Sequence, residues 1–599
     1  NRSFLNKDFE SLRADLIEYA RVHFRDKIQD FSDPSVGALF TDLAAYIGDN
    51  LSYYLDFQFN ELDPETVIEA KNFVKLLQRA GIKSISATPS LVDLLVSVNV
   101  PAATVGGVQV PQLSAIPVIS AGSTFSADGI IFELLDTLDY RVTDKGTYVA
   151  AVEVAQSSAG LPTSFKMTLT GKGISGTRAV DTFEIPNVFE KFRSITLSNV
   201  DVTQIISVTD ASQNTYYEVE SLTHDTVFRR ESNTSNDSVL VPDVMRLQPV
   251  PYRFVSETSF TTLLTTLRFG AGSASTLDDD IIPDPSEFAV PLYGKTTFAR
   301  FTIDPANLLK TRTLGIAPQG TVLSVVYRHG GGLRHNIAAG SITTPNDLVI
   351  TFPGLPSVAT LISVRNSVAV TNPKQAGGGE NTPTIDDLRL QINAARNAQS
   401  RIVTREDLLA RVYTMPSSFG RVYRAGIVDD SSRPLSTQLY VISRDLSNNL
   451  VIAPDALKEN MRVYLDQFRL ISDAIDILDA PVINVGVEFK VKISSQASNK
   501  QLVIESAILA VKKQLEIVRM QINQPIVLDD IQQAIYNVPG VVSVIDTKVV
   551  SYTNVVNNRV YSDVLFDVRT NTRDKIIVPP PGGIFEVKYP DFDIIGSAV

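Results

Sequence analysis

Two short segments carry residue types that could do chemistry. Residues 289–296 (AVPLYGKT) follow a relaxed phosphate-loop pattern, in which Lys295 would contact phosphates and Thr296 would bind magnesium. Such a loop has to lie between a strand and a helix whose N-terminus faces the phosphate. The residues that follow, 297–301, favour a strand, and Pro291 removes one backbone donor from the loop. We therefore interpret this segment as a turn between strands.

The second segment, His329-Gly330-Gly331-Gly332, resembles the oxyanion-hole stretch of some esterases. Those enzymes also need a Gly-x-Ser-x-Gly turn that exposes a nucleophilic serine. The nearest match, residues 173–177 (GISGT), lacks the last glycine. The glycines are therefore interpreted as a turn, and a serine hydrolase is not expected.

Metal ligands are few and scattered. The chain has no cysteine and four histidines, of which only His329 and His335 are close in sequence. The acidic run Asp278–Asp280 could attract a cation, but a run of like charges is usually a solvated surface, and a calcium loop needs alternating ligands. The sequence predicts no catalytic residue, no cofactor and no metal site, and so a protein that is not an enzyme.

Composition points to a large globular protein. The 599 residues are 44% hydrophobic and 20% charged, which is typical of several folded domains in one chain. The net charge of −12 argues against binding nucleic acid, because phosphate contacts need a basic face. The most apolar stretch, Gly106 to Gly122, is interrupted by Gln109 and Pro111. We therefore expect no membrane insertion.

The N-terminal region has the periodicity of three helices. The first is predicted over residues 7–27, and the second begins with Asp33 as N-cap and Pro34 in the first turn. The third is predicted to begin in the same way at Asp63 and Pro64 and to end at Gly81. Because the apolar spacing is three to four residues, each helix should bury one face.

Further along the chain the apolar period changes to two, and it later becomes mixed. Short β-type runs separated by turn residues extend to about Pro373, and a glycine-rich hinge is predicted at Gly377–Gly379. Beyond it, helical and strand patterns alternate. The sequence predicts a multidomain α+β protein with these parts: an N-terminal helical bundle segment (1–85), a β-rich middle of two or more domains (86–375), an α/β module (376–480), a second α/β module (481–550) and a β-like C-terminal tail (551–599).

An internal similarity links the two α/β modules. Residues 406–416 and 529–539 align with a constant offset: an acidic helix start, an apolar face, a tyrosine and then a proline before a β-type run. Chance similarity between two short helices is one explanation. Two related modules in tandem are the other, and we favour the second.

The N-terminal helices carry more apolar side chains than three helices readily bury. Tyr46, Tyr53, Phe57, Phe59 and Leu76 widen the apolar faces. Either the next domain covers them or the helices of partner chains complete the bundle. On the second interpretation, Tyr53, Phe57 and Leu76 lie in or near a partner interface.

Two groups of motifs occur in a fixed order along the chain. The helical region contains these: Asp8-Phe9, Ser11-Leu12-Arg13, Ser35-Val36-Gly37, Asp42-Leu43-Ala44, Leu51-Ser52-Tyr53-Tyr54, Asn60-Glu61, Ala70, Asn72, Leu76-Leu77 and Ala80-Gly81. The later region contains Gly377-Gly378-Gly379-Glu380, Asp386, Leu390 and Ile402 to Asp407. Through about Val549, these motifs resemble the baseplate wedge proteins of contractile-tailed bacteriophages, the baseplate J-like family, whose J-like core corresponds to the later region.

The resemblance implies a structural scaffold of a virion tail baseplate, assembled in the host cytoplasm. Its implied partners are a second copy of the chain, other wedge proteins joined through a helical bundle, and neighbouring wedges in a six-fold ring around the central hub. Such a scaffold transmits the conformational change that triggers sheath contraction. A wedge-like component of a bacterial contractile injection or secretion system is the alternative, and a tail fibre adhesin is a further one.

Overall fold

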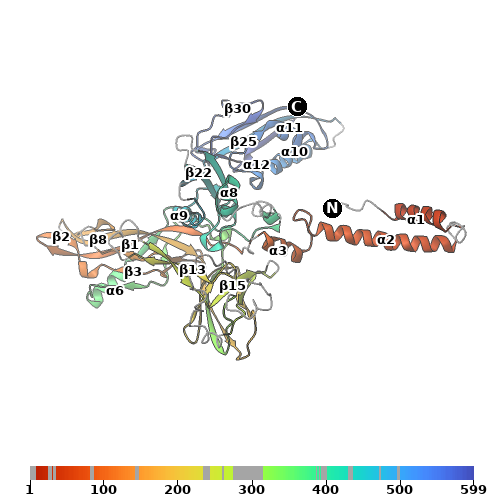
Figure 1. Ribbon diagram of the computed structural model, residues 1–599. Helices are drawn as coiled ribbons and strands as arrows, with labels where there is room; N and C mark the ends of the chain where they lie inside the picture. The colour runs from red at the N-terminus through yellow and green to blue at the C-terminus, as the bar shows by residue number, and fades with distance from the viewer. Residues whose placement is uncertain are drawn as a thin grey trace, which may run out of the picture. The chain divides into compact units, whose positions relative to one another are not determined.

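The computed structural model describes most of the chain, and its residues group into two compact units. The described residues are 8–24, 30, 35–80, 82, 86–141, 148–158, 160–233, 243–259, 262–273, 314–385, 387–389, 392, 401–429, 436–470, 474–495 and 499–598. One unit comprises Asn1–Ser84 with Thr384–Ala398, and the other comprises Ile85–Pro383 with Gln399–Val599. The multidomain α+β class predicted from the sequence is confirmed, with helices first, sheets in the middle and a mixed C-terminal part (Figure 1).

The first unit contains three helices, α1 (Phe9–His23), α2 (Val36–Asn60) and α3 (Ala70–Arg79). The N-cap of α2 is Ser35, whose hydroxyl accepts a hydrogen bond from the Ala38 amide at 3.0 Å. The predicted N-cap, Asp33, was therefore wrong by two residues, and Asp33 itself lies outside the described residues. Both candidates are good capping residues, and the sequence pattern does not distinguish them.

Helix α3 begins six residues later than predicted, because a buried carboxylate organises the chain before it. The side chain of Glu61, only 4% exposed, accepts hydrogen bonds from the Ile68 and Glu69 amides and from the Asn72 side chain at 2.9 Å. Burial alone would raise the pKa of Glu61, but these hydrogen bonds outweigh it and hold the pKa below its usual value. The carboxylate thus binds the two backbone amides that precede α3 and the Asn72 side chain in the first turn of the helix.

Residues 384–398 also belong to the first unit, although the sequence assigns them to the 376–480 module. Within this segment Leu388 and Ile392 are buried, and Arg389 donates to the Val67 carbonyl at 2.7 Å. Val67 is itself buried, as are Phe73 and Leu77 of α3. The small core of this unit is therefore completed by a segment more than 300 residues away in sequence.

The β-rich middle contains two large sheets. The eight-stranded sheet has the order β18-β4-β5-β8-β1-β2, with β20 added to β1 and β7 added to β8. Its strands are β1 (Leu91–Val105), β2 (Val108–Pro111), β4 (Thr124–Ala127), β5 (Ile130–Leu134), β7 (Ala151–Ser158), β8 (Leu161–Ser175), β18 (Thr344–Pro345) and β20 (Ala369–Thr371). Smaller elements beside it are β3 (Val118–Ile119), β6 (Leu138–Asp139), β19 (Ile350–Thr351) and α6 (Val358–Asn366).

The seven-stranded sheet has the order β10-β16-β15-β12-β11-β17-β9. Its strands are β9 (Thr177–Ile185), β10 (Ser194–Val200), β11 (Val202–Asp210), β12 (Thr215–Glu218), β15 (Arg253–Thr258), β16 (Leu264–Phe269) and β17 (Thr321–His329), and a separate hairpin is formed by β13 (Thr226–Ser232) and β14 (Asp243–Pro249). Gly106 and Gly107 have positive φ and turn β1 into β2, so the β-type pattern of residues 105–110 is divided between two strands.

The C-terminal part contains two four-stranded sheets. The first has the order β21-β22-β23, with β24 parallel to β22. Its elements are α8 (Arg405–Tyr413), β21 (Arg424–Asp429), β22 (Ser436–Arg444), β23 (Leu450–Val451), α9 (Asp455–Leu465) and β24 (Ala474–Asp479). The second has the order β27-β25-β32, with β33 parallel to β25.

The elements of the second sheet, with the short strands near it, are β25 (Val482–Ile493), α10 (Lys500–Gln514), β26 (Ile526–Val527), α11 (Leu528–Tyr536), β27 (Val541–Tyr552), β28 (Val555–Val556), β29 (Arg559–Val560), β30 (Thr572–Arg573), β31 (Ile576–Ile577), β32 (Ile584–Glu586), α12 (Pro590–Asp593) and β33 (Ile594–Ala598). Strands β32 and β33 come from the predicted tail, 551–599, and are integral to this sheet. The two C-terminal sheets are alike in one respect. The strand that follows α8 is β21 and the strand that follows α11 is β27, and each runs antiparallel to a central strand, β22 or β25. Each central strand also has a parallel neighbour. The chain connections differ, however, since the central strand follows α8 but precedes α11. The equivalence of the two modules stays a prediction.

The predicted hinge at Gly377–Gly379 is instead a buried strap, and this prediction was wrong. Gly377 exchanges backbone hydrogen bonds with Leu91, and the Gly378 carbonyl accepts from the Thr88 hydroxyl at 2.8 Å. Gly379 exchanges hydrogen bonds with the Asn336 side chain. Because these partners are distant in sequence, the pattern of glycines alone suggests flexibility where the fold has none.

Candidate interaction surface

The residues singled out for phosphate or cation binding do not yield a site. Lys295, Thr296 and Asp278–Asp280 lie outside the described residues. Within the part of the chain that the structure describes, no group of three histidine, aspartate or glutamate side chains could hold a metal ion.

The structure does bring together a serine and a histidine, but in a buried place. The Ser175 hydroxyl lies 2.9 Å from His335 Nδ1 and accepts a hydrogen bond from the Ser90 amide at 2.8 Å. Burial, together with the nearby Arg334 charge, lowers the pKa of His335. Ser175 is 0% exposed, so no substrate carbonyl can reach it. The pair joins the ends of β1 and β8 to the turn after β17.

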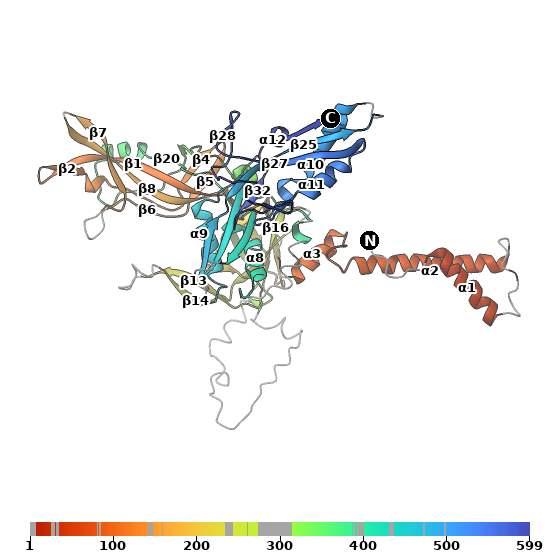
Figure 2. The ribbon, with the colours of Figure 1, turned by 90° about the horizontal axis from the view of Figure 1, so that it is seen from above.

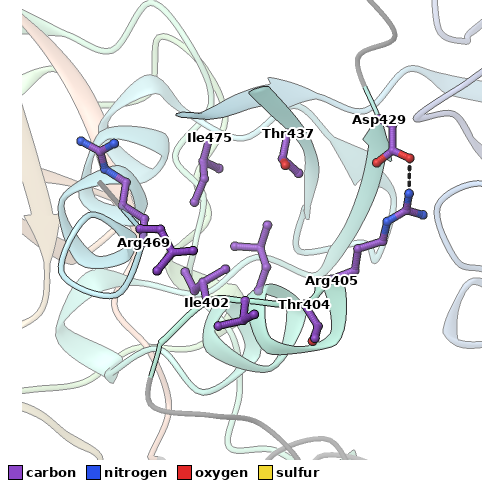
Figure 3. A pocket seen from close by; sticks show the side chains of 10 residues that line it. Ile402, Thr404, Arg405, Asp429, Thr437, Arg469 and Ile475 are labelled. Carbon is purple, nitrogen blue, oxygen red and sulfur yellow. Dashed lines mark hydrogen bonds and ion pairs between the residues drawn. The ribbon is translucent and has the colours of Figure 1, made fainter. Parts of the chain in front are cut away.

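A small cavity lies between α8 and the first C-terminal sheet (Figure 3). Its volume is about 130 Å³, and its lining includes Thr404, Arg405, Asp429 and Thr437. Ligand pockets usually measure about 300 Å³ or more. Arg405 is paired with Asp429, and the Thr404 hydroxyl caps α8 by accepting from the Asp407 amide. Thr404, Arg405 and Asp429 are therefore already engaged within the fold.

The strongest functional feature is the apolar surface of α1 and α2. Helix α2 is 25 residues long, yet only Ala38, Ala45 and Asn60 are buried, and α1 has no buried residue. At least half of the side-chain surface is exposed for these residues of the two helices: Tyr19, Val22, Val36, Leu39, Phe40, Leu43, Tyr46, Ile47, Leu51, Tyr53, Tyr54 and Phe59. A helix that is apolar on most faces is normally buried. We call this set the α1–α2 apolar surface.

Contacts between α1 and α2 cover little of this surface. Arg13 Nε pairs with Asp42 Oδ1 at 2.5 Å, and Leu12 packs against Gly48. A Cβ at position 48 would lie 3.1 Å from Leu12 Cδ1, so the glycine allows the two helices to approach closely. The two helices lie side by side in Figure 1 and Figure 2.

The three predicted interface residues have different environments. Tyr53 is 67% exposed on α2, whereas Phe57 of α2 and Leu76 of α3 are partly buried. Phe40, Leu43 and Ile47 recur at helical spacing and belong to one exposed stripe of α2. The sequence predicts that this apolar face packs in the core of the helical bundle. The periodicity identified the stripe correctly, but it does not say which chain covers it.

In the part of the chain that the structure describes, the helices are too short or too polar to cross a membrane.

Among solved structures, the chain aligns with a protein of the anti-feeding prophage (AFP) baseplate, determined by cryo-EM with six-fold symmetry. The alignment covers 100% of this chain and 91% of that chain, with 12% sequence identity and a TM-score of 0.27. No protein-family model and no curated protein matches the sequence. A TM-score of this size does not establish a shared fold, so function has to be inferred from the residues and surfaces of this chain.

Proposed function

We propose that this chain is a structural wedge subunit of a contractile tail baseplate and that the α1–α2 apolar surface joins it to its partner subunits. The proposal has two supports. One is the order of sequence motifs, from Asp8-Phe9 to Asp407, that resembles the wedge family. The other is the exposed surface, and this second observation carries the proposal.

The size of the exposed side chains makes association favourable. Burying a leucine, isoleucine or phenylalanine side chain stabilises a complex by about 1.5–3 kcal/mol before the costs of association. Leu43 is 54% exposed and Phe40 is 66% exposed, so each still has much of this free energy to gain. Translational and side-chain entropy offset part of it. Several such residues along one helix are enough to leave a net drive for binding.

In this role the chain has no catalytic residue, no cofactor and no metal. Its partners are a second copy, other wedge proteins that complete a helical bundle with α1 and α2, and neighbouring wedges in a six-fold ring. The protein works in the tail baseplate of the virion after assembly in the host cytoplasm, and it passes on the change that starts sheath contraction.

A wedge-like subunit of a bacterial contractile injection or secretion system is the second candidate. It would carry the same J-like core and the same apolar surface, and the neighbouring genes distinguish the two sources. A tail fibre adhesin is the third candidate, and the absence of a coiled-coil or β-helical periodicity in the sequence disfavours it.

Deletion of the gene in the producing strain tests the proposal. We expect tubes and sheaths without an assembled baseplate in electron micrographs, and restored particles when the wild-type gene is supplied in trans. The Leu43→Asp variant should fail to restore them, because it places a charge in the apolar surface. The Gln58→Glu variant, which adds the same charge at an exposed polar position of α2, should restore them. Intact, contraction-competent particles from the deletion strain would refute the proposal.

A further inference from the structure

The strand β27 has one unpaired edge. It pairs with β25 on one side and is the terminal strand of its sheet, and no described strand pairs with its other side (Figure 2). At 12 residues it is long for an edge strand. Proteins usually shorten or interrupt such edges because their free N–H and C=O groups pair readily with another strand.

The two faces of this sheet differ in character. Residues of β27 that are paired with Val487, Phe489 and Val491 of β25 face the apolar core. The other face is exposed and charged. On it, Lys548 lies opposite Glu488, and Asp546 lies opposite Lys490. Each cross-strand pair therefore joins opposite charges.

The charges on the free edge are self-complementary. Lys548 Nζ lies 3.2 Å from Asp546 Oδ2 within the strand. When two copies of β27 run antiparallel with Thr547 at the centre, Asp546 of each copy lies opposite Lys548 of the other. The row across the four strands would then read Lys490, Asp546, Lys548 of the second copy and Glu488 of the second copy, with charges alternating in sign.

We infer that the free edge of β27 pairs antiparallel with the same edge of a second copy of this chain, centred on Thr547. The pairing joins two four-stranded sheets into one continuous sheet with two-fold symmetry, as a self-complementary contact requires. This inference deepens the proposed function, on which it rests for the second copy as a partner, and it names the surface through which that copy binds. It is argued from the strand edge and its charges and not from the α1–α2 apolar surface.

Neighbouring registers are excluded by the same charges. Side chains alternate between the two faces of a strand. A pairing that keeps the charged faces of both copies on the same side of the joined sheet must therefore be centred on a residue, and the nearest alternative centres are the two neighbours of Thr547. Centring on Asp546 would place two aspartates opposite each other, and centring on Lys548 would place two lysines opposite each other. Like charges directly opposite destabilise a strand pair.

The irregularities of β27 limit the pairing to a short stretch. The register with β25 shifts at Ile545 and again at Val542, which marks two bulges in the first half of the strand. The bulges leave Asp546 to Tyr552 regular against β25. Within that stretch the hydroxyls of Thr547 and Ser551 are buried without a hydrogen-bond partner. At the centre of the pairing, the two Thr547 hydroxyls would face each other.

A single introduced cysteine tests the register, because the natural chain has no cysteine. Opposed residues of antiparallel strands have Cα atoms about 4.5–5.5 Å apart, which a disulfide can bridge. Full-length chain carrying Thr547→Cys should form a covalent dimer under mild oxidation. Ser551→Cys is the matched control on the same face. Its two copies would lie eight residues out of register, about 26 Å apart.

We expect Thr547→Cys to shift from the mass of one chain to that of two on a non-reducing gel, and Ser551→Cys to remain a single chain. Equal cross-linking of both variants, or none in either, overturns the inference.

Charge reversal gives a second, independent test, and a melting curve of each variant separates lost pairing from the destabilisation caused by like charges opposite Lys490 or Glu488 within the sheet. Asp546→Lys alone and Lys548→Asp alone each place like charges opposite each other in the pair, so each variant should sediment with a smaller dimer fraction than the wild type. Mixed together, the two variants are complementary again and should form a heterodimer. The absence of recovery in the mixture overturns the inference. Leu43→Asp leaves this edge unchanged, so failure at β27 can be distinguished from failure of the proposed function.

Discussion

Removing the arginine that pairs with Glu380 should destabilise the chain in a pH-dependent way. Glu380 is 5% exposed, and both of its carboxylate oxygens accept from Arg444, with Nη2 at 2.5 Å and Nε at 3.0 Å. Its backbone also exchanges hydrogen bonds with Thr88. The pair thus holds the buried strap against both β1 and β22. Arg444→Met keeps most of the aliphatic stem and removes the charge.

The expected cost follows from the burial of the carboxylate. Taking one partner from a buried ion pair destabilises a protein by about 3–5 kcal/mol, because the remaining charge is uncompensated. The lower value corresponds to roughly a 150-fold change in the folding equilibrium. A matched exposed pair, Arg462 with Glu459, provides the control. Arg462→Met should cost less than about 1 kcal/mol.

The pKa of Glu380 determines whether the loss of stability in the variant grows or shrinks as the pH rises. Burial raises the pKa of Glu380 despite the opposing influence of Arg444, Arg421 and Arg424. A raised pKa in the folded state means that stability from this group is present below the unfolded pKa and is lost as the pH rises through the folded value. Without Arg444 the pKa rises further. The Arg444→Met variant should therefore be closest to the wild type at acidic pH, where Glu380 is protonated, and fall behind as the pH rises.

Differential scanning calorimetry at several pH values measures the shift in the transition temperature, and urea titration followed by tyrosine fluorescence gives the free energy. The chain has 19 tyrosines and no tryptophan, so tyrosine is the available probe. The double variant Glu380→Gln with Arg444→Met should recover part of the loss, since no buried charge remains. If Arg444→Met costs no more than Arg462→Met, or costs the same at every pH, the electrostatic account of the strap is wrong.

Three further outcomes are expected. Leu43→Asp should weaken association of the chain with its partner subunits by roughly 30-fold, measured by sedimentation, because a side chain worth about 2 kcal/mol is lost from the interface. The pKa of Glu586 is raised to about 7 by burial, so stability should decline as the pH rises from about 5 to about 8, and Glu586→Gln should flatten that decline in urea titrations. Thr404→Ala should cost about 1 kcal/mol through loss of the α8 capping box, seen as a lower transition midpoint, whereas Thr404→Ser should cost little.

Local signals in the sequence predicted the elements whose formation is local. Helix α8, Arg405–Tyr413, is an example, because its start is defined by Thr404 and Asp407, which cap each other three residues apart. Helix α3 is a contrary case. Its start depends on the Glu61 carboxylate, which lies several residues upstream and outside any standard capping position. An acidic residue followed by proline, as at Asp63 and Pro64, was the wrong signal there.

Long-range partners explain the largest errors. Three glycines at 377–379 predicted a hinge, yet the atoms that immobilise them come from Leu91, Thr88 and Asn336, and Thr88 is 290 residues away from Gly378. Nothing in the segment itself reports those partners. The same reason explains why the first unit contains residues 384–398, since a short apolar segment can complete any small core that it reaches.

The candidate surfaces show where sequence reasoning ends. The period of the apolar residues in α2 is local, so the sequence predicted that Leu43 and its neighbours share a face. Whether that face is covered depends on what packs against it, and the other elements of the same unit leave Leu43 54% exposed. For β27, even less can be predicted from the sequence of the segment alone. Its strand character was predictable from alternation, but an edge exists only relative to a sheet order, and Asp546 and Lys548 gain meaning only after Lys490 and Glu488 are placed beside them. The pattern of one segment therefore indicates which side chains the segment can bury and whether it can pair as a strand. The fold decides which of these surfaces stays free to bind another chain.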